Sequence, residues 1–293
     1  MDYELASYEP AQRADYLRLL EEAWSDLSLS PVEFDWWFEN PAGSVMAVAR
    51  DHREVVGVAS HSLFRAILGG EPAVASFSVH ATTAEPARGQ GIFEALERRN
   101  EEEAQRRGVA VVLAFASKPT APIFLGPLGW TEIGKLRVWA RAFPRLGSKP
   151  RAVGRIEQFR HAGDAASAWP NHIVRDAAYL NWRYLSSPRR YEAFAFGGSY
   201  AVLGHKEHRG TRLAYIADLV GDPRTVLRAC LGAVDGEARA VVAIPAPEHR
   251  KTYASLGFLP TKTTLHLMGK GLAGQLDIRP RAWRFTLGDT DFF

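Results

Sequence analysis

The chain has 293 residues, of which 46% are hydrophobic and 24% charged, and its formal net charge is +3. This length accommodates one large domain or two of about 140 residues, each able to bury a core. The mildly basic balance suits an anionic ligand, whereas the lack of Lys and Arg tracts excludes the usual nucleic-acid-binding classes. The single cysteine, Cys230, excludes an internal disulfide and a multi-thiolate metal site, which favours a reducing compartment.

The sequence also argues against a membrane location. Residues 1–20 are acidic and periodic, unlike a signal peptide, and no apolar run approaches the roughly 18 residues needed to span a bilayer. We therefore expect a cytoplasmic protein with neither a membrane nor a nucleic acid among its partners.

Strand-like and helix-like segments alternate along the first half. Alternating or continuous apolar residues predict strands, and apolar residues spaced by three or four predict helices. The first helix presents Tyr16, Leu19, Leu20 and Trp24 on one face. The predicted elements, in chain order, are a strand over 3–9, helices over 10–27 and 31–40, strands over 45–51, 53–68 and 73–84, a helix over 92–108 with a solvated charged face, and a buried strand over 109–116.

The second half repeats part of this pattern. Ala-Val-Val at 110–112 returns at 240–242, and Leu-Gly-Trp at 128–130 is echoed by Leu-Gly-Phe at 256–258. Two short matches in the same order, at nearly the same offset, indicate two related α/β halves, with chance recurrence as the alternative. The predicted domains are 1–146, 155–272 and a C-terminal tail over 273–293, with a linker between Pro144 and Gly154.

A glycine-containing loop, Ala-Arg-Gly-Gln-Gly-Ile-Phe at 87–93, lies between a predicted strand and a predicted helix. Such a turn leaves several backbone N–H groups pointing outward in front of the positive helix end, which makes an anion site. A Walker loop would need Gly-Lys-Ser/Thr, and a dinucleotide fingerprint would need a third small residue where Glu94 stands. The pattern that remains is Arg-x-x-Gly-x-Gly/Ala, a loop for the pyrophosphate of coenzyme A. The alternative is a capped turn without a ligand.

With this loop the chain resembles the GNAT superfamily of acetyl-CoA-dependent N-acyltransferases. Residues 88–93 match the family motif except that Phe93 replaces a small residue, and the resemblance covers about residues 3–143. The stretches at 182–191, which begins Trp-Arg-Tyr-Leu, and at 283–293, which begins Trp-Arg-Phe, also resemble a bacterial subgroup with two tandem GNAT-type halves. The resemblance implies an α/β fold class, in which each half has a mixed, mostly antiparallel sheet flanked by helices.

The resemblance further implies direct transfer of an acetyl group from acetyl-CoA to a primary amine. Only the first half carries the loop motif, so coenzyme A is expected to bind there alone. The family places the oxyanion donor, a backbone N–H, near Thr82 and Thr83, and a pantetheine contact near Ser117 or Thr120, for which a helix N-cap is the alternative. The cofactor-binding residues implied in this way are Thr82, Thr83, Arg88, Gly89, Gln90, Gly91, Ile92, Phe93, Ser117 and Thr120.

Acyl transfer to an amine requires a proton acceptor, and the sequence has no motif for a covalent nucleophile. His80, on the strand before the loop, is the leading candidate, with a structural histidine as the alternative; His61 is a weaker one. The C-terminal tail is aromatic and acidic, and it supplies two further catalytic candidates, Asp289 and Asp291, unless it only packs. In many family members a tyrosine protonates the leaving thiolate, but Leu125 stands at that position here.

The helix over 31–40 combines acidic and tryptophan side chains, which suit a cationic amine through charge and cation–π contact. Asp35, Trp36 and Trp37 are therefore the predicted substrate-binding residues, with a role in the core as the alternative for the tryptophans. The nine histidines show no metal-ligand spacing, so no metal is expected. A rival from another class is an acyl-CoA-binding or scaffold protein without catalysis, which Leu125 and the degenerate second half favour.

Overall fold

A computed structural model of the chain describes residues 3–24, 29–116, 120–142, 154–160, 169–196, 198–208, 210–234 and 238–290. The chain divides into two compact units. Unit 1 comprises Met1–Gly134 with His266–Arg279, and unit 2 comprises Lys135–Leu265 with Pro280–Phe293.

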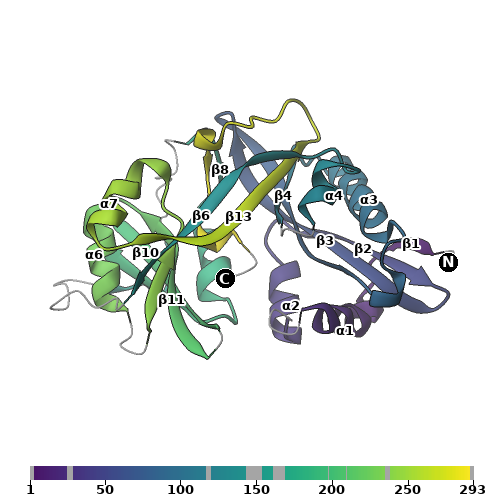
Figure 1. Cartoon of the computed structure of the whole chain (residues 1–293), viewed down its shortest axis with the longest axis horizontal. Helices are drawn as coiled ribbons and strands as arrows, with labels where there is room; N and C mark the ends of the chain where they lie inside the picture. Colours follow the sequence, from purple (N-terminus) through teal and green to yellow (C-terminus); the bar gives the residue numbers. More distant parts are fainter. Residues whose placement is uncertain are drawn as a thin grey trace. The chain divides into compact units, whose positions relative to one another are not determined.

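Unit 1 is built on a mixed sheet (Figure 1). β2, β3 and β4 are consecutive antiparallel strands. β5 joins parallel to β4 through Ala75–Phe77 and Val111–Leu113, and β13 pairs antiparallel with β5. In sheet order the strands are β1 Glu4–Ser7, β2 Ser44–Asp51, β3 Glu54–Leu68, β4 Glu71–Thr83, β5 Val111–Ala116, β13 Leu259–Gly271 and β6 Thr131–Ala142.

Helices cover both faces of the sheet in unit 1 (Figure 1). On one face, Tyr16 of α1 and Phe34 of α2 pack against Val58 of β3. On the other, Leu96 of α3 packs against Ala59, the next residue of the same strand. Because successive strand residues point to opposite faces, a strand covered on both sides must be apolar throughout. The helices are α1 Arg13–Ala23, α2 Pro31–Phe38, α3 Ile92–Arg106 and α4 Ala121–Leu125, with single 3₁₀ turns at Pro10–Gln12 and Glu85–Ala87.

The strands and helices predicted for the first half are all present, but one end of the first helix differs. Tyr16, Leu19 and Leu20 are buried as predicted. Trp24 is 37% exposed, because α1 ends at Ala23 and Trp24 is its C-cap, with a backbone that is no longer helical. The predicted helical face therefore holds for three of its four residues.

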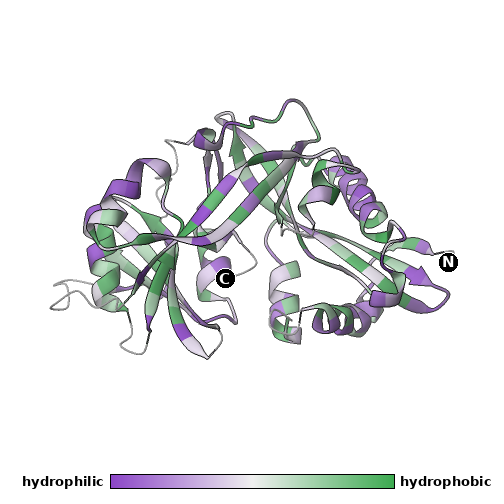
Figure 2. Ribbon diagram, viewed as in Figure 1, coloured by the Kyte–Doolittle hydropathy of each residue, from purple (hydrophilic) through white to green (hydrophobic). Residues whose placement is uncertain are grey.

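The prediction of a fully solvated charged face on α3 is wrong. Figure 2 shows that α3 is hydrophilic over much of its surface. Nevertheless Glu97 is completely buried and Glu101 is 6% exposed. Glu97 and Glu101 are four residues apart and the buried Ala104 follows Glu101 by three, so the three share one side of the helix, which faces the interior rather than the solvent. Glu101 accepts hydrogen bonds from the indole N–H of Trp130 and from the ammonium group of Lys270.

Unit 2 also contains mixed β-structure, in which β9, β10 and β11 form an antiparallel meander and β12 joins parallel to β11. Its strands are β6 with β7 Gly154–Arg155, β8 Asn171–Ile173, β9 Tyr191–Phe196, β10 Ser199–His208, β11 Thr211–Val220, β12 Ala240–Ala243, β13 and β14 Trp283–Arg284. Its helices are α5 Ala177–Leu180, α6 Pro223–Ala233 and α7 Arg250–Ser255, with a π-helical turn at Asn181–Leu185 and 3₁₀ turns at Pro247–His249, Pro280–Ala282 and Leu287–Asp289.

The two sequence matches between the halves correspond to equivalent structure. The first Ala-Val-Val stretch runs into the start of β5, and the second lies in β12. Each of these strands runs parallel to the strand before the preceding helix. Gly129 and Gly257 both follow a short helix with φ near the left-handed region, at +68° and +83°. The next residue, Trp130 or Phe258, donates its N–H back to that helix. The two halves therefore share element order and one helix-ending motif.

The compact units do not coincide with the predicted boundaries at 146 and 155, because each half gives its last strand to the other unit. In unit 1, β5 pairs with β13 of the second half, through His266–Gly271. In unit 2, β12 pairs with β6 of the first half, through Trp139–Ala142. The sequence pattern gives the order of the strands but not this reciprocal pairing. The domains 1–146, 155–272 and 273–293 stay a prediction about the linear halves.

Candidate functional site

The loop between β4 and α3 has a backbone that only glycine adopts readily. Gly89 and Gly91 have φ values of +75° and +76°, and Gly91 is the N-cap of α3. A Cβ added at either glycine would meet no heavy atom within 4 Å. The glycines are therefore required by their backbone conformation and not by crowding, and the space in front of them is open.

The first turn of α3 offers hydrogen-bond donors to this space. Within the described ranges, no protein group accepts a hydrogen bond from the backbone N–H of Gly91, Ile92 or Phe93. These are among the donors that a helix leaves unsatisfied at its N-terminus, where the helix dipole also favours an anion. Arg88, which is exposed, is anchored by a hydrogen bond from its Nε to the carbonyl oxygen of Thr83, at 3.2 Å. The loop thus combines backbone donors with one guanidinium.

A gap between two parallel strands lies next to the loop. The register of β4 against β5 ends at Phe77 and Leu113, although β4 continues to Thr83 and β5 to Ala116. Beyond that point, within the described residues, the two strands are not paired with each other. Main-chain groups on this side of β4 are therefore available to a ligand.

The backbone N–H of Thr83, at the end of β4, is one such group. The N–H of Ala84 donates to the carbonyl oxygen of Val56 on β3, at 2.8 Å. N–H groups alternate in direction along an antiparallel strand. The backbone N–H of Thr82 therefore also points toward β3, whereas the backbone N–H of Thr83 points away from it. The carbonyl oxygen of Thr83 points the same way, since it accepts from Arg88.

His80 lies at a β-bulge on β4. Val58 pairs with Thr82 and Ser60 with Val79, so that Ala59 stands opposite both His80 and Ala81. His80 has a φ of +49°, one of two positive values among the non-glycine residues described. Such backbone strain persists only when surrounding contacts hold it, and it gathers at functional sites.

Two hydroxyl groups hold this bulge. The hydroxyl of Tyr16 donates to the carbonyl oxygen of His80 at 3.1 Å, and the hydroxyl of Ser60 donates to that of Val79 at 2.7 Å. The imidazole of His80 lies edge-on to Trp37 and Phe38, with ring centroids 5.6 and 6.0 Å away. The histidine is therefore partly buried and fixed in place by aromatic rings.

Comparisons with known proteins agree with this architecture. No protein-family model matches the sequence, and no curated protein does. A GCN5-related N-acetyltransferase from Kribbella flavida superposes with a TM-score of 0.67 at 19% identity, covering 93% of this chain and 71% of that one. A second, from Anabaena variabilis, gives 0.70 at 12% identity over 92% and 73%. A probable N-acyltransferase from Enterococcus faecalis gives 0.67 at 10% identity over 93% and 73%.

The chain has the GCN5-related N-acetyltransferase (GNAT) fold. The fold implied by the loop motif is thereby confirmed. The gap between β4 and β5, the bulge at His80 and the glycine loop belong to one region of that fold in unit 1. The site residues themselves stay predictions, and their positions follow.

The predicted substrate-binding residues lie on α2. Trp36 and Trp37 are 9% and 2% exposed, which agrees with the alternative that they belong to the core. Asp35 has a half-exposed side chain, and its carboxylate pairs with the guanidinium of Arg13. Only Asp35 of the three therefore reaches solvent to a large extent.

His61 has a different setting from His80. Its Nε2 lies 2.9 Å from Oε2 of Glu97, and both side chains are completely buried. The hydroxyl of Ser78 donates to the other oxygen of Glu97, at 2.9 Å. These contacts link β3, β4 and α3 inside unit 1, and they favour a structural role for His61 over the catalytic one.

The residues after β5 are only partly described. Ser117 lies outside the described residues. Thr120 is the N-cap of α4, without a side-chain capping bond. Leu125, at the position of the family's tyrosine, ends α4 and is 45% exposed. A hydroxyl that protonates a thiolate is therefore lacking at that position.

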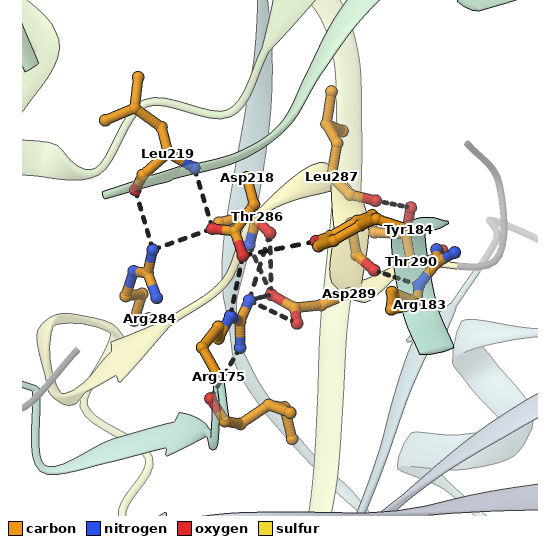
Figure 3. Close-up of polar contacts among 12 residues, drawn as sticks. Arg175, Arg183, Tyr184, Asp218, Leu219, Arg284, Thr286, Leu287, Asp289 and Thr290 are labelled. Carbon is orange, nitrogen blue, oxygen red and sulfur yellow. Dashed lines mark hydrogen bonds and ion pairs between the residues drawn. The ribbon is translucent and has the colours of Figure 1, made fainter. Parts of the chain in front are cut away.

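Asp289, the first catalytic candidate of the tail, lies in unit 2 (Figure 3). Its side chain is buried, and both carboxylate oxygens accept from Nη2 of Arg175 at 2.7 Å. One oxygen also accepts from the backbone N–H of Thr286, at 2.8 Å. This bonding favours the packing alternative for the described part of the tail. Asp291 lies outside the described residues.

A buried ionic cluster surrounds Asp289, and sequence reasoning missed it. Arg175 also donates to Asp218, which accepts in addition from Arg284 and from the backbone N–H of Leu219 (Figure 3). Burial alone would raise the pKa of the Asp218 carboxyl, but the guanidinium groups of Arg175 and Arg284 outweigh it and lower the pKa. A single aspartate within the apolar strand β11 was the only signal of this cluster in the sequence.

The described ranges contain no group of three or more His, Cys, Asp or Glu that could hold a metal ion. None of their helices is long and apolar enough to cross a membrane.

Proposed function

We propose that this protein is an acyl-CoA-dependent N-acyltransferase that moves an acetyl group from acetyl-CoA to a small primary amine. The observation that carries the proposal is the loop of Arg88–Phe93, where two left-handed glycines leave open space before unsatisfied N–H groups. The pyrophosphate of coenzyme A matches this site in charge, and Arg88 adds a cation. The remaining proposed cofactor contacts come from Gln90, Ser117 and Thr120.

The thioester would lie along the unpaired end of β4. There the N–H of Thr83, which points away from β3, supplies a hydrogen bond to the oxyanion that forms when the amine attacks. A donor fixed in advance stabilises such a charge without reorganisation. Of the two threonines considered, the alternation of the strand favours Thr83 over Thr82.

His80 is the proposed proton acceptor. Its imidazole suits proton transfer near neutral pH, and its strained backbone keeps it at the bulge beside α2. Asp35, on the same helix as Trp37, supplies a carboxylate for the cationic amine. Asp291 remains a proposed participant from the tail, and Asp289 is the weaker of the two because Arg175 holds it.

No covalent enzyme intermediate is needed. Burial raises the pKa of the Cys230 thiol to about 12, so this cysteine is not a thiolate nucleophile at neutral pH. A thiolate is a good leaving group, which makes the missing tyrosine at Leu125 tolerable. A reduced, buried Cys230 also suits the cytoplasm, which we include in the proposal.

The second candidate function is an acyl-CoA-binding protein without catalysis, which the exposed Leu125 favours. Release of free thiol from acetyl-CoA in the presence of a panel of small amines distinguishes the two. We expect amine-dependent thiol release above the rate without protein. Tight acetyl-CoA binding without any amine-dependent release would support the inactive binder instead, and the lack of binding would overturn both.

A further inference from the structure

Unit 2 contains a second parallel strand pair, equivalent in order to β4 and β5 of unit 1. β11 pairs with β12 through Leu213–Tyr215 and Ala240–Val242, and β11 then continues to Val220. A cavity of about 110 Å³ lies at the carboxyl ends of these strands. Crevices at the carboxyl ends of parallel strands are the usual ligand sites of α/β sheets.

A segment of the chain itself narrows this cavity. Arg284, the last residue of β14, and the two residues after it form part of its lining, together with Asp218 and Tyr253. The remaining cavity volume is suited to a small molecule and not to a nucleotide. The Trp169, Tyr253 and Phe285 side chains give the cavity aromatic walls.

Arg284 supplies a guanidinium group to the lining of this cavity, which also contains Asp218 and His249. The carboxylate of Asp218 is already saturated by Arg175, by Arg284 and by the N–H of Leu219. Arg284 uses its Nη2 for Asp218 and for the carbonyl oxygen of Leu219, each at 3.0 Å. Its Nη1 is buried and has no hydrogen-bond partner among the described residues. A buried guanidinium N–H without an acceptor is costly, and an anionic ligand would satisfy it.

The N-terminus of the neighbouring helix α6 is less favourable to a phosphate than that of α3. The N-cap of α6 is Asp222, whose carboxylate accepts from the N–H of Thr225 at 2.8 Å. The helix end that would attract a phosphate thus carries a negative side chain, in contrast to Gly91 of α3. A singly charged carboxylate is repelled less than a phosphate by this aspartate and by Asp218.

We propose that the cavity of unit 2 binds a small aromatic carboxylate. The carboxylate accepts a hydrogen bond from Arg284, and the ring packs between Trp169 and Tyr253. This site is separate from the proposed acyl-CoA loop and does not depend on it.

The test uses the full chain and two probes of the same shape, benzoate and the uncharged benzamide. Calorimetry should show that benzoate binds at least tenfold more tightly than benzamide, as expected for a charge-assisted hydrogen bond. Equal affinities, or no benzoate binding, would overturn the proposal. Arg284→Gln should abolish the preference for benzoate, and retention of the preference in that folded variant would also count against it.

The location is tested without touching the ionic cluster. Ala246 lines the cavity, and Ala246→Phe should fill it and weaken benzoate binding by tenfold or more. Ala254, exposed on α7 and outside the lining, gives the matched control Ala254→Phe, which should bind benzoate as the wild type does. Undiminished binding to Ala246→Phe would place the ligand elsewhere. Acetyl-CoA affinity should stay the same in both variants, which separates this result from the fate of the proposed function.

Discussion

Gly91 is the residue whose conformation most directly ties the loop to a ligand. Asparagine tolerates the left-handed region better than other side chains do, so Gly91→Asn should fold. Its side chain would occupy the open space before α3, and we expect acetyl-CoA affinity to fall at least tenfold by calorimetry.

Gly43 supplies the matched control for that experiment. It too has a positive φ, +86°, and open space around an added Cβ, but it lies in the turn before β2. Gly43→Asn should show a similar change in melting temperature with unchanged acetyl-CoA affinity. Unchanged affinity in a folded Gly91→Asn variant would remove the phosphate site from the loop.

Replacement by asparagine also tests the role of His80. Because its φ is +49°, His80→Asn keeps the strained backbone while it removes the proton acceptor. We expect amine-dependent thiol release to fall by roughly 10²-fold or more, with acetyl-CoA affinity retained. Full turnover in His80→Asn would return attention to the tail, above all to Asp291.

Arg175 supports a prediction about stability and pH. It pairs with both Asp218 and Asp289 inside unit 2. Arg175→Gln would leave the buried carboxylate of Asp289 without its cation and Asp218 with Arg284 alone. We expect a loss of about 3–5 kcal/mol in the free energy of unfolding at neutral pH, measured by urea denaturation.

The loss should shrink in acid. In the wild type the pKa of the Asp218 carboxyl is lowered despite its burial, because Arg175 and Arg284 lie beside it. Its stabilising contribution is therefore present above the unfolded-state pKa, about 4, and is lost as pH falls below that value. In Arg175→Gln, protonation instead relieves a buried charge. If the difference in the free energy of unfolding between the wild type and Arg175→Gln stays constant as the pH falls below about 4, this assignment is contradicted.

For individual residues, the sequence revealed only features that are contiguous in the chain. Arg88, Gly89 and Gly91 could be recognised because a loop motif is contiguous in the chain. The burial of Glu97 could not, because its partner His61 is 36 residues away. Asp218 likewise meets Arg175 across 43 residues. Ionic pairs of this kind are set by the fold and leave no spacing pattern.

At the level of elements, prediction succeeded where periodicity is strong. The continuous apolar run of β5 and the amphipathic spacing of α1 gave both elements to within a few residues. The bulge on β4 was not predictable in position, because it depends on hydroxyl groups of Tyr16 and Ser60 that come from other elements. The bulge also decides which way Thr83 points, so this feature of the site needed the structure.

A comparison of α3 and α6 predicts the number of cofactors bound. α3 begins at Gly91, without a capping side chain, whereas α6 begins at Asp222, whose carboxylate occupies the helix end. Hydrogen bonds from Thr225 also lower the pKa of Asp222, which keeps it charged. We therefore expect one acetyl-CoA per chain in a calorimetric titration. A stoichiometry of two would show that unit 2 also accepts the cofactor.

For the whole molecule, the fold class followed from sequence but the division into units did not. The loop motif at 88–93, together with the helix and strand order of the first half, indicated a GNAT-like sheet. The pairing of β13 with β5 and of β6 with β12 joins residues more than 95 positions apart, and many strands of similar composition would fit either place. A boundary near residue 146, drawn from the order of elements along the chain, therefore separates strands that pair with each other.

The strand exchange leads to the last prediction. A fragment of residues 1–146 contains β5 but lacks His266–Gly271, the strand that covers one edge of it. Since every residue of β5 is buried, this fragment would expose a long apolar strand edge, which favours aggregation. We expect residues 1–146 produced alone to be insoluble or unfolded by circular dichroism.

Co-expression with residues 147–293 restores the missing strand and is the control for the break in the chain. The two fragments should then copurify as a soluble, folded complex with a single unfolding transition. A soluble, monomeric and cooperatively folded 1–146 fragment would show that the first half is complete without β13, and that the predicted linear domains describe its folding better than the compact units do.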